Sequence, residues 1–145
     1  MENIFIKKLT HEYVNDVSTL EKEYIGTGDV DAIKNSLNSD KLNYYILLKN
    51  DKVVGFMECL ILPPEMELYD IVVSKENQGK GYSKILMDYM ISLAKENNVE
   101  TILLEVNSIN NKAINLYQKY GFKEYSIRKN YYGDSDAVLM KLKLL

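Results

Sequence analysis

The chain has 145 residues, of which 46% are hydrophobic and 27% are charged, and its formal net charge is -3. This length suits one compact domain with its own core, so we expect a single domain over residues 1–145. The slight negative charge argues against non-specific binding to nucleic acid and favours cationic partners such as amines.

The composition also excludes several kinds of site. The longest apolar run, 53–62, contains Glu58 and is too short to span a membrane, and no signal peptide opens the chain, so we expect a cytoplasmic protein without a membrane partner. The single cysteine, Cys59, excludes an internal disulfide and reads as a small core residue. The single histidine, His11, gives little support to a Ser-His-Asp triad or a metal site, and we expect no metal. The chemistry must therefore use carboxylates, tyrosines or backbone groups.

The first half of the chain reads as a strand, two helices and a hairpin. Thr10 is a candidate N-cap, and the turn Asn50-Asp51 predicts an antiparallel hairpin that ends before Pro63-Pro64. The two helices are expected to cover the core; a flap over a substrate is the alternative. The predicted elements are a strand at 4–9, helices at 10–24 and 29–38, and strands at 44–49 and 52–61.

The second half reads as a strand-helix-strand unit followed by a helix and two strands. The strand-helix-strand order predicts parallel pairing of 66–73 with 101–106. Asn110 or Asn111 can cap the following helix, and Gly121 suits its left-handed C-terminal residue. The predicted elements are strands at 66–73 and 101–106, helices at 81–97 and 110–120, and strands at 123–128 and 137–142. The fold class is α/β, an α+β arrangement with a mixed sheet.

The turn between residues 73 and 82 has the features of an anion site. Backbone N–H groups in a tight turn, followed by a helix N-terminus, bind phosphate without a particular side chain. Gly79 and Gly81 allow close approach of a ligand, and Lys80 and Lys84 add positive charge. An ordinary strand-to-helix turn is the alternative.

Spacing separates three phosphate-binding patterns. The P-loop pattern G-x-x-x-x-G-K-[ST] is absent, and in a dinucleotide fingerprint that begins at Gly79 the third glycine would be Lys84. The third pattern, Q-x-x-G-x-[G/A], is filled by Gln78, Gly81 and Ser83, where serine replaces the usual glycine or alanine. It resembles the acetyl-coenzyme A (acetyl-CoA) pyrophosphate loop of the GNAT acetyltransferase superfamily.

Further motifs follow at fixed spacing and look like the RimI branch of that superfamily, the ribosomal-protein-alanine N-acetyltransferases. They are Leu104-Glu105-Val106, Asn110, Ala113-Ile114, Leu116-Tyr117, Tyr120-Gly121-Phe122, Ile127-Arg128, Asn130-Tyr131-Tyr132, Asp136-Ala137 and Met140. The resemblance covers about the last eighty residues, and the first sixty only by element order. Residues 24–30 lack the Pro-Trp pair expected in close RimI relatives. The fold implied is the GNAT acyl-CoA N-acyltransferase fold, a mostly antiparallel sheet with a splayed parallel strand pair and about four helices.

The resemblance implies acetyl-CoA as co-substrate. Backbone groups of Ile71, Val72 and Val73 would bind pantetheine and help to polarise the thioester, and Asn110 would bond the pantetheine in addition to capping its helix. The implied coenzyme-binding residues are Ile71, Val72, Val73, Gln78, Gly79, Lys80, Gly81, Tyr82, Ser83, Lys84 and Asn110.

Glu105 and Tyr117 match the general base and general acid of the family. Glu105 is a lone carboxylate inside the apolar run 102–106, where burial would raise its pKa and make it a better proton acceptor. A solvated strand face is the alternative for Glu105, and a packing role is the alternative for Tyr117. An α-amine, with a pKa of roughly 7.7 to 8.0, needs less help from a single glutamate than a lysine amine near 10.4.

The implied activity is acetyl transfer to the α-amine of a protein N-terminus, with a ribosomal protein as one candidate, by direct attack. Tyr131 and Tyr132 are expected to flank the acceptor peptide. The alternatives are acetylation of a small amine such as a polyamine or aminoglycoside, and a non-catalytic CoA sensor, against which Glu105 and Tyr117 argue. The sequence favours no oligomeric state.

Overall fold

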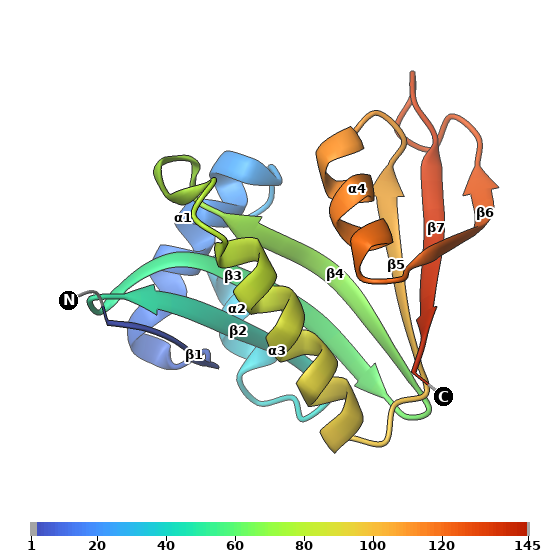
Figure 1. Ribbon diagram of the computed structural model, residues 1–145. Helices are drawn as coiled ribbons and strands as arrows, with labels where there is room; N and C mark the ends of the chain where they lie inside the picture. Colours follow the sequence, from blue (N-terminus) through green and yellow to red (C-terminus); the bar gives the residue numbers. More distant parts are fainter. Residues whose placement is uncertain (1–2, 145) are drawn as a thin grey trace. The chain divides into compact units, whose positions relative to one another are not determined.

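The computed structural model describes residues 3–144, whose path is shown in Figure 1. This part of the chain contains seven strands, four α-helices and two short 3-10 helices, η1 and η2. In chain order they are β1 (Ile4–Lys8), η1 (His11–Tyr13), α1 (Val14–Tyr24), α2 (Val30–Ser36), β2 (Leu42–Lys49), β3 (Lys52–Leu62), β4 (Glu65–Val73), η2 (Lys75–Asn77), α3 (Tyr82–Glu96), β5 (Thr101–Asn107), α4 (Asn111–Lys119), β6 (Lys123–Arg128) and β7 (Ala137–Lys143). The predicted domain 1–145 includes residues 1, 2 and 145, which lie outside the described residues.

The strands form one sheet in the order β1-β2-β3-β4-β5-β7-β6. The pairs β1–β2, β2–β3, β5–β7 and β6–β7 are antiparallel, and β4–β5 is parallel. This confirms the predicted fold class and the predicted parallel pair. The parallel ladder joins Glu65–Leu68 to Thr101–Leu104, although β4 continues to Val73 and β5 to Asn107.

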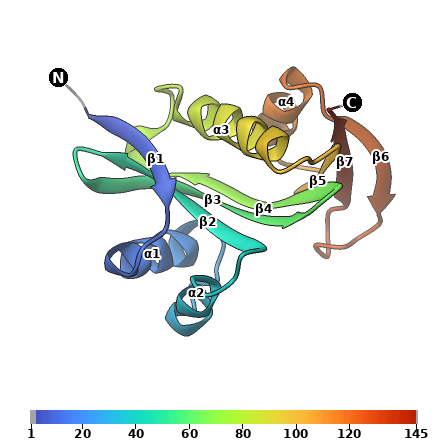
Figure 2. The same cartoon turned by 90° about the horizontal axis from the view of Figure 1, so that it is seen from below.

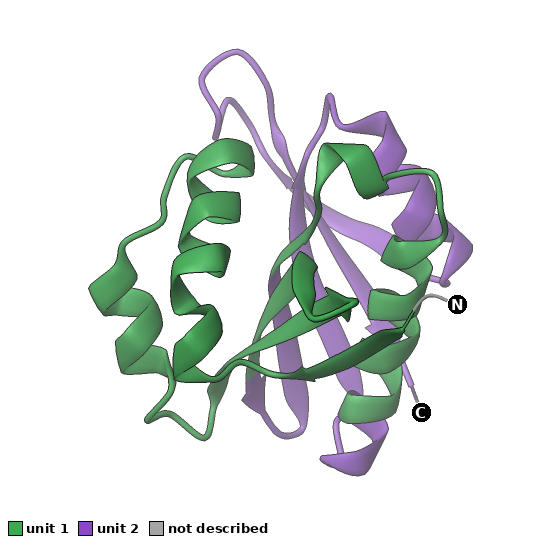
Figure 3. Ribbon diagram, turned by 90° about the vertical axis from the view of Figure 1, so that its left-hand side faces the viewer, with its two compact units in different colours: residues 1–60, 70–93 green, residues 61–69, 94–145 purple. Residues whose placement is uncertain are grey.

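The chain divides into two compact units, coloured separately in Figure 3. Unit 1 comprises residues 1–60 and 70–93, and unit 2 comprises 61–69 and 94–145. Both units are discontinuous in sequence, and β4 contributes to each of them. No single cut would therefore separate the chain into two contiguous domains, and the expectation of one domain stays a prediction.

Unit 1 is a layered structure in which helices cover both faces of the strands: α1 and α2 lie on one face and α3 on the other (Figure 2). Every residue of β2 from Asn43 to Leu48 is buried, because alternate side chains point to the two covered faces. Ile46 and Leu48 belong to the core beneath α1 and α2. On the α3 side, the rings of Tyr45 and Tyr89 lie 5.3 Å apart.

Unit 2 is covered by α4 on one face of its strands (Figure 2). Buried and half-buried residues alternate along β5, with Ile102, Leu104 and Val106 buried. Val138 and Met140 of β7 pair with Val106 and Leu104 and are also buried. The opposite face of β5, which carries Glu105, therefore keeps partial exposure to solvent.

Every predicted strand and helix is present. The predicted start of the first helix, at residue 10, is wrong. The N–H of Tyr13 donates to the carbonyl of Thr10 at 3.1 Å and closes a tight 3-10 turn. Thr10 makes no side-chain cap, and α1 begins only at Val14. No helix among residues 3–144 is long and apolar enough to cross a membrane.

Candidate functional site

The turn at Gly79-Lys80-Gly81 has the backbone geometry of an anion-binding loop. The φ angles of Gly79 and Gly81 are 78° and 82°, in the left-handed region that side chains other than glycine rarely adopt. A Cβ built on either glycine would meet no atom within 4 Å, so the space beside both is open. The N–H of Ile85 donates to the carbonyl of Gly81, which begins α3, and the N–H groups of the first turn have no partner within the helix. These features fit a diphosphate.

Hydrogen bonds from two side chains that precede the glycines hold the turn in place within unit 1. The Nε2 of Gln78 donates to the carbonyl of Val73 at 3.0 Å, so this side chain links the turn to the end of β4. The buried Asn77 donates through Nδ2 to Ser74 Oγ at 2.8 Å. Tyr82 is buried, and its part in a coenzyme site would come from its backbone. The predicted coenzyme residues from Ile71 to Lys84 all belong to unit 1.

Glu105 lies on β5 of unit 2, on the strand face that alternates with the buried residues. Its side chain is 28% exposed, and its Oε1 lies 3.4 Å from Nη1 of Arg128. The expected burial of Glu105 in an apolar strand is therefore wrong. The strand alternates, so Leu104 and Val106 point into the core while Glu105 points to the partly open face.

Asn110 is the N-cap of α4, and Tyr117 lies in the last turn of the helix. The Oδ1 of Asn110 accepts from the N–H of Ala113 at 3.1 Å, which confirms the predicted helix cap. Tyr117 is buried, and its ring meets Phe122 edge-on with centroids 5.8 Å apart. Gly121 ends the helix with φ 95°, as expected. Glu105, Asn110 and Tyr117 all belong to unit 2.

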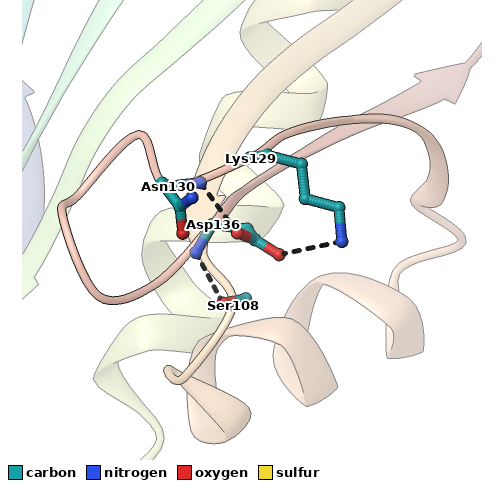
Figure 4. Close-up of polar contacts among 4 residues, drawn as sticks. All are labelled: Ser108, Lys129, Asn130 and Asp136. Atoms are coloured by element: carbon teal, nitrogen blue, oxygen red, sulfur yellow. Dashed lines mark hydrogen bonds and ion pairs between the residues drawn. The ribbon is translucent and has the colours of Figure 1, made fainter.

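Asp136 organises the loop between β6 and β7 (Figure 4). Its Oδ1 accepts from the N–H of Asn130 at 2.9 Å, and its Oδ2 lies 4.0 Å from Nζ of Lys129. Its own N–H donates to Ser108 Oγ at 3.1 Å, and its carbonyl accepts from the N–H of Ser108 at 2.9 Å. The carboxylate of Asp136 thus holds the loop together, and its backbone connects the loop through Ser108 to the segment that precedes α4.

This loop carries Tyr131 and Tyr132, which are 53% and 45% exposed. Their rings are nearly perpendicular, with centroids 5.1 Å apart. The guanidinium carbon of Arg128 lies 5.7 Å from the centroid of Tyr131. Arg128 therefore contacts both Glu105 and Tyr131. The role of the two tyrosines in binding an acceptor stays a prediction.

Unit 1 contains a group of carboxylates that is not apparent from the sequence: Glu21, Glu58 and Asp70, with Tyr44. The hydroxyl of Tyr44 donates to Glu21 Oε1 at 2.5 Å, and Thr27 Oγ1 donates to Glu21 Oε2 at 3.2 Å. Burial, then the charges of Asp70 and Glu21, raise the pKa of Glu58 to about 7. Burial, then the charge of Glu21, raise the pKa of Asp70 to about 6. Of these residues only Glu58 stands out in the sequence, because it is a charged residue within an apolar run.

Two further predictions concern cysteine and metal. Cys59 is fully buried, and burial raises the pKa of its thiol, which confirms a core role. Within residues 3–144 no group of three or more histidine, cysteine, aspartate or glutamate side chains could hold a metal ion.

The arrangement of the sheet, the glycine turn and the α3 N-terminus is that of an acyl-CoA N-acyltransferase. Residues 8–122 match the acetyltransferase (GNAT) family, and the chain belongs to this family of acetyl-CoA-dependent N-acetyltransferases.

Relatives and solved structures agree with this assignment. The chain is 38% identical, over 75% of its length and 77% of the relative, to the [ribosomal protein bS18]-alanine N-acetyltransferase of Haemophilus influenzae. The crystal structure of the ribosomal-protein-S18-alanine N-acetyltransferase from Escherichia coli aligns with a TM-score of 0.89 at 25% identity, over 98% of this chain and 94% of that one. An aminoglycoside 6'-N-acetyltransferase complexed with coenzyme A shares the fold, with a TM-score of 0.86 at 15% identity over 97% of each chain.

Proposed function

We propose that this enzyme transfers acetyl from acetyl-CoA to the α-amine of a ribosomal protein, with the counterpart of bS18 as the first candidate. The observation that carries the proposal is the 38% identity to the enzyme of Haemophilus influenzae that bears this name. We place the reaction in the cytoplasm.

The proposed reaction is direct attack of the amine on the thioester. Glu105 accepts a proton from the attacking nitrogen, and Tyr117 donates one to the departing thiolate. Proton transfer from a tyrosine with a pKa near 10 to the thiolate of a thiol with a pKa near 8.5 costs roughly 2 kcal/mol. This cost is tolerable when the tyrosine hydroxyl and the sulfur are aligned. The partial exposure of Glu105 gives an acceptor access to its carboxylate.

In the proposed coenzyme site the turn at Gly79–Ser83 and the first turn of α3 hold the diphosphate. The backbone of Ile71–Val73 holds the pantetheine arm. The positive φ angles and the open space beside Gly79 and Gly81 support this assignment. Lys80 and Lys84 add positive charge to the turn.

We expect acetyl-CoA to stabilise the wild-type protein against thermal unfolding and Gly81→Glu to abolish this stabilisation. The new side chain would occupy the space reserved for the diphosphate and would repel it. Differential scanning fluorimetry with increasing acetyl-CoA measures this effect.

Gly26→Glu is the matched control, because Gly26 also has a positive φ, of 92°, and open space beside it. Both variants carry a similar conformational cost and the same added charge. We expect the Gly26 variant to keep its response to acetyl-CoA. An undiminished response in the Gly81 variant would refute the diphosphate assignment.

Mass spectrometry of N-terminal peptides, from cells with and without the protein, tests the acceptor. We expect the counterpart of bS18 to lose α-amine acetylation when the protein is absent. If no protein α-amine changes while a small amine loses its acetyl group, the protein acceptor is excluded. The fold shared with the aminoglycoside acetyltransferase makes such an amine the second candidate. If the protein binds acetyl-CoA but acetylates no amine, it is the non-catalytic CoA sensor.

A further inference from the structure

The loop between β6 and β7 has its own hydrogen-bonded structure. The N–H of Gly133 donates to the carbonyl of Asn130 at 3.0 Å, and the N–H of Tyr132 donates to the carbonyl of Ser135 at 3.0 Å. Asn130 has a φ of 54°, in the left-handed region where asparagine is enriched. These bonds fix the backbone around Tyr131 and Tyr132, so the placement of both rings depends on the conformation of the loop.

The carboxylate of Asp136 closes this loop. Its Oδ1 accepts from the N–H of Asn130, six residues earlier, at 2.9 Å. The side chain of Asp136 is 28% exposed, whereas that of Lys129, whose Nζ lies 4.0 Å from Oδ2, is 82% exposed. An ion pair with so exposed a lysine adds little, so the hydrogen bond to Asn130 is the contact that holds the start of the loop.

The backbone of Asp136 attaches the closed loop to the end of β5 (Figure 4). Its N–H donates to Ser108 Oγ at 3.1 Å, and its carbonyl accepts from the N–H of Ser108 at 2.9 Å. Ser108 directly follows β5, the strand that carries Glu105, and all of these residues belong to unit 2. The loop therefore has a fixed position relative to the strand of the proposed base.

The two tyrosines of the loop form an exposed aromatic surface. The rings of Tyr131 and Tyr132 are both exposed and stand at 87° to one another. Arg128 contacts the ring of Tyr131 and also the carboxylate of Glu105, so this surface is connected to the proposed base. Tyrosine offers a peptide a large contact area and a hydroxyl at a low cost in side-chain entropy.

We propose that Asp136 is a positioning residue, which sets the preference for a peptide acceptor by holding Tyr131 and Tyr132 in the arrangement that a peptide binds. Without the carboxylate only a fraction of the molecules keeps this arrangement, and the apparent affinity for the peptide falls by that fraction. The coenzyme does not depend on this loop, so its binding stays unchanged. This inference rests on the proposed transfer to a protein α-amine.

Asp136→Ala and Asp136→Asn are the test, assayed with a peptide that has a free N-terminal alanine. Alanine removes both oxygens, whereas the amide oxygen of asparagine can still accept from the N–H of Asn130. We expect the alanine variant to raise the KM for the peptide roughly fivefold to tenfold, with kcat and the KM for acetyl-CoA within about twofold of the wild type. The asparagine variant should restore the peptide KM to within about threefold.

Asp134→Ala is the matched control, because it removes the same charge from an exposed position between the same two strands. We expect its peptide KM to stay within about twofold of the wild type. Hydrogen–deuterium exchange measures the loop itself: the amides of residues 129–135 should exchange faster in Asp136→Ala than in the wild type, but not in Asp134→Ala.

Ser108→Ala provides a second variant should Asp136→Ala not fold. It removes the hydroxyl that accepts from the N–H of Asp136 but leaves the hydrogen bond from the N–H of Ser108 in place. We expect it to raise the peptide KM by a smaller factor than Asp136→Ala, again with kcat and the KM for acetyl-CoA unchanged.

Three results would overturn the inference: a wild-type peptide KM in these variants, a loss confined to kcat, or an asparagine variant as impaired as the alanine variant. The wild-type reaction separates these results from a failure of the proposed function. If the wild-type protein acetylates a small amine and not the peptide, the proposed acceptor is wrong. If it acetylates the peptide and the Asp136 variants do so equally well, only the role of Asp136 is wrong.

Discussion

Glu105→Gln is expected to lower kcat/KM for an N-terminal peptide by about 10²-fold to 10⁴-fold, the usual range for loss of a general base. The amide keeps the size of the side chain but accepts no proton at neutral pH. Steady-state kinetics at saturating acetyl-CoA gives this value.

Glu124→Gln serves as its control, since Glu124 is an exposed glutamate on β6 of the same unit. We expect this change to leave kcat/KM within about twofold of the wild type. A Glu105 variant that retains more than a tenth of the wild-type kcat/KM would remove Glu105 from the proton path.

Glu58→Gln is expected to stabilise the protein at pH 8 and to have a smaller effect at pH 5. The pKa of Glu58 is raised to about 7 in the folded state, above the value of about 4.3 expected for an unfolded chain. Between these values the folded state binds more protons than the unfolded state, so the free energy of unfolding falls as the pH rises. Glutamine removes this buried charge at pH 8, where the glutamate is ionised.

The expected gain at pH 8 is about 1 to 3 kcal/mol after allowance for solvent screening, or roughly 3 to 10 °C in Tm. Thermal unfolding followed by circular dichroism at both pH values measures it. Glu23→Gln, on an exposed face of α1 in the same unit, should change Tm little at either pH. A Glu58 variant less stable than the wild type at pH 8 would show that the carboxylate is held by interactions stronger than its burial cost.

The local sequence was sufficient to predict features that depend on a few neighbouring residues. The turn at Asn50 and Asp51 has φ angles of 50° and 68°, which suit a two-residue hairpin, and Asn110 and Gly121 begin and end α4 as expected. In each case the hydrogen bonds that decide the conformation lie within a few residues of the residue on which the prediction was based.

The same reasoning failed where a side chain's environment depends on which strands lie beside it. Glu105 and Arg128 meet because β7 pairs with both β5 and β6, an order that local patterns do not encode. The contact of Asp136 with Ser108 likewise joins residues 28 positions apart.

The most direct test of transfer to a protein α-amine uses the purified protein, acetyl-CoA and two forms of one peptide. The peptide carries an N-terminal alanine and an internal lysine, and in the second form the α-amine is blocked. Tandem mass spectrometry locates any acetyl group, and a polyamine and an aminoglycoside are assayed in parallel. We predict acetylation of the free α-amine alone, whereas acetyl groups found only on lysine or only on the small amines would contradict the account.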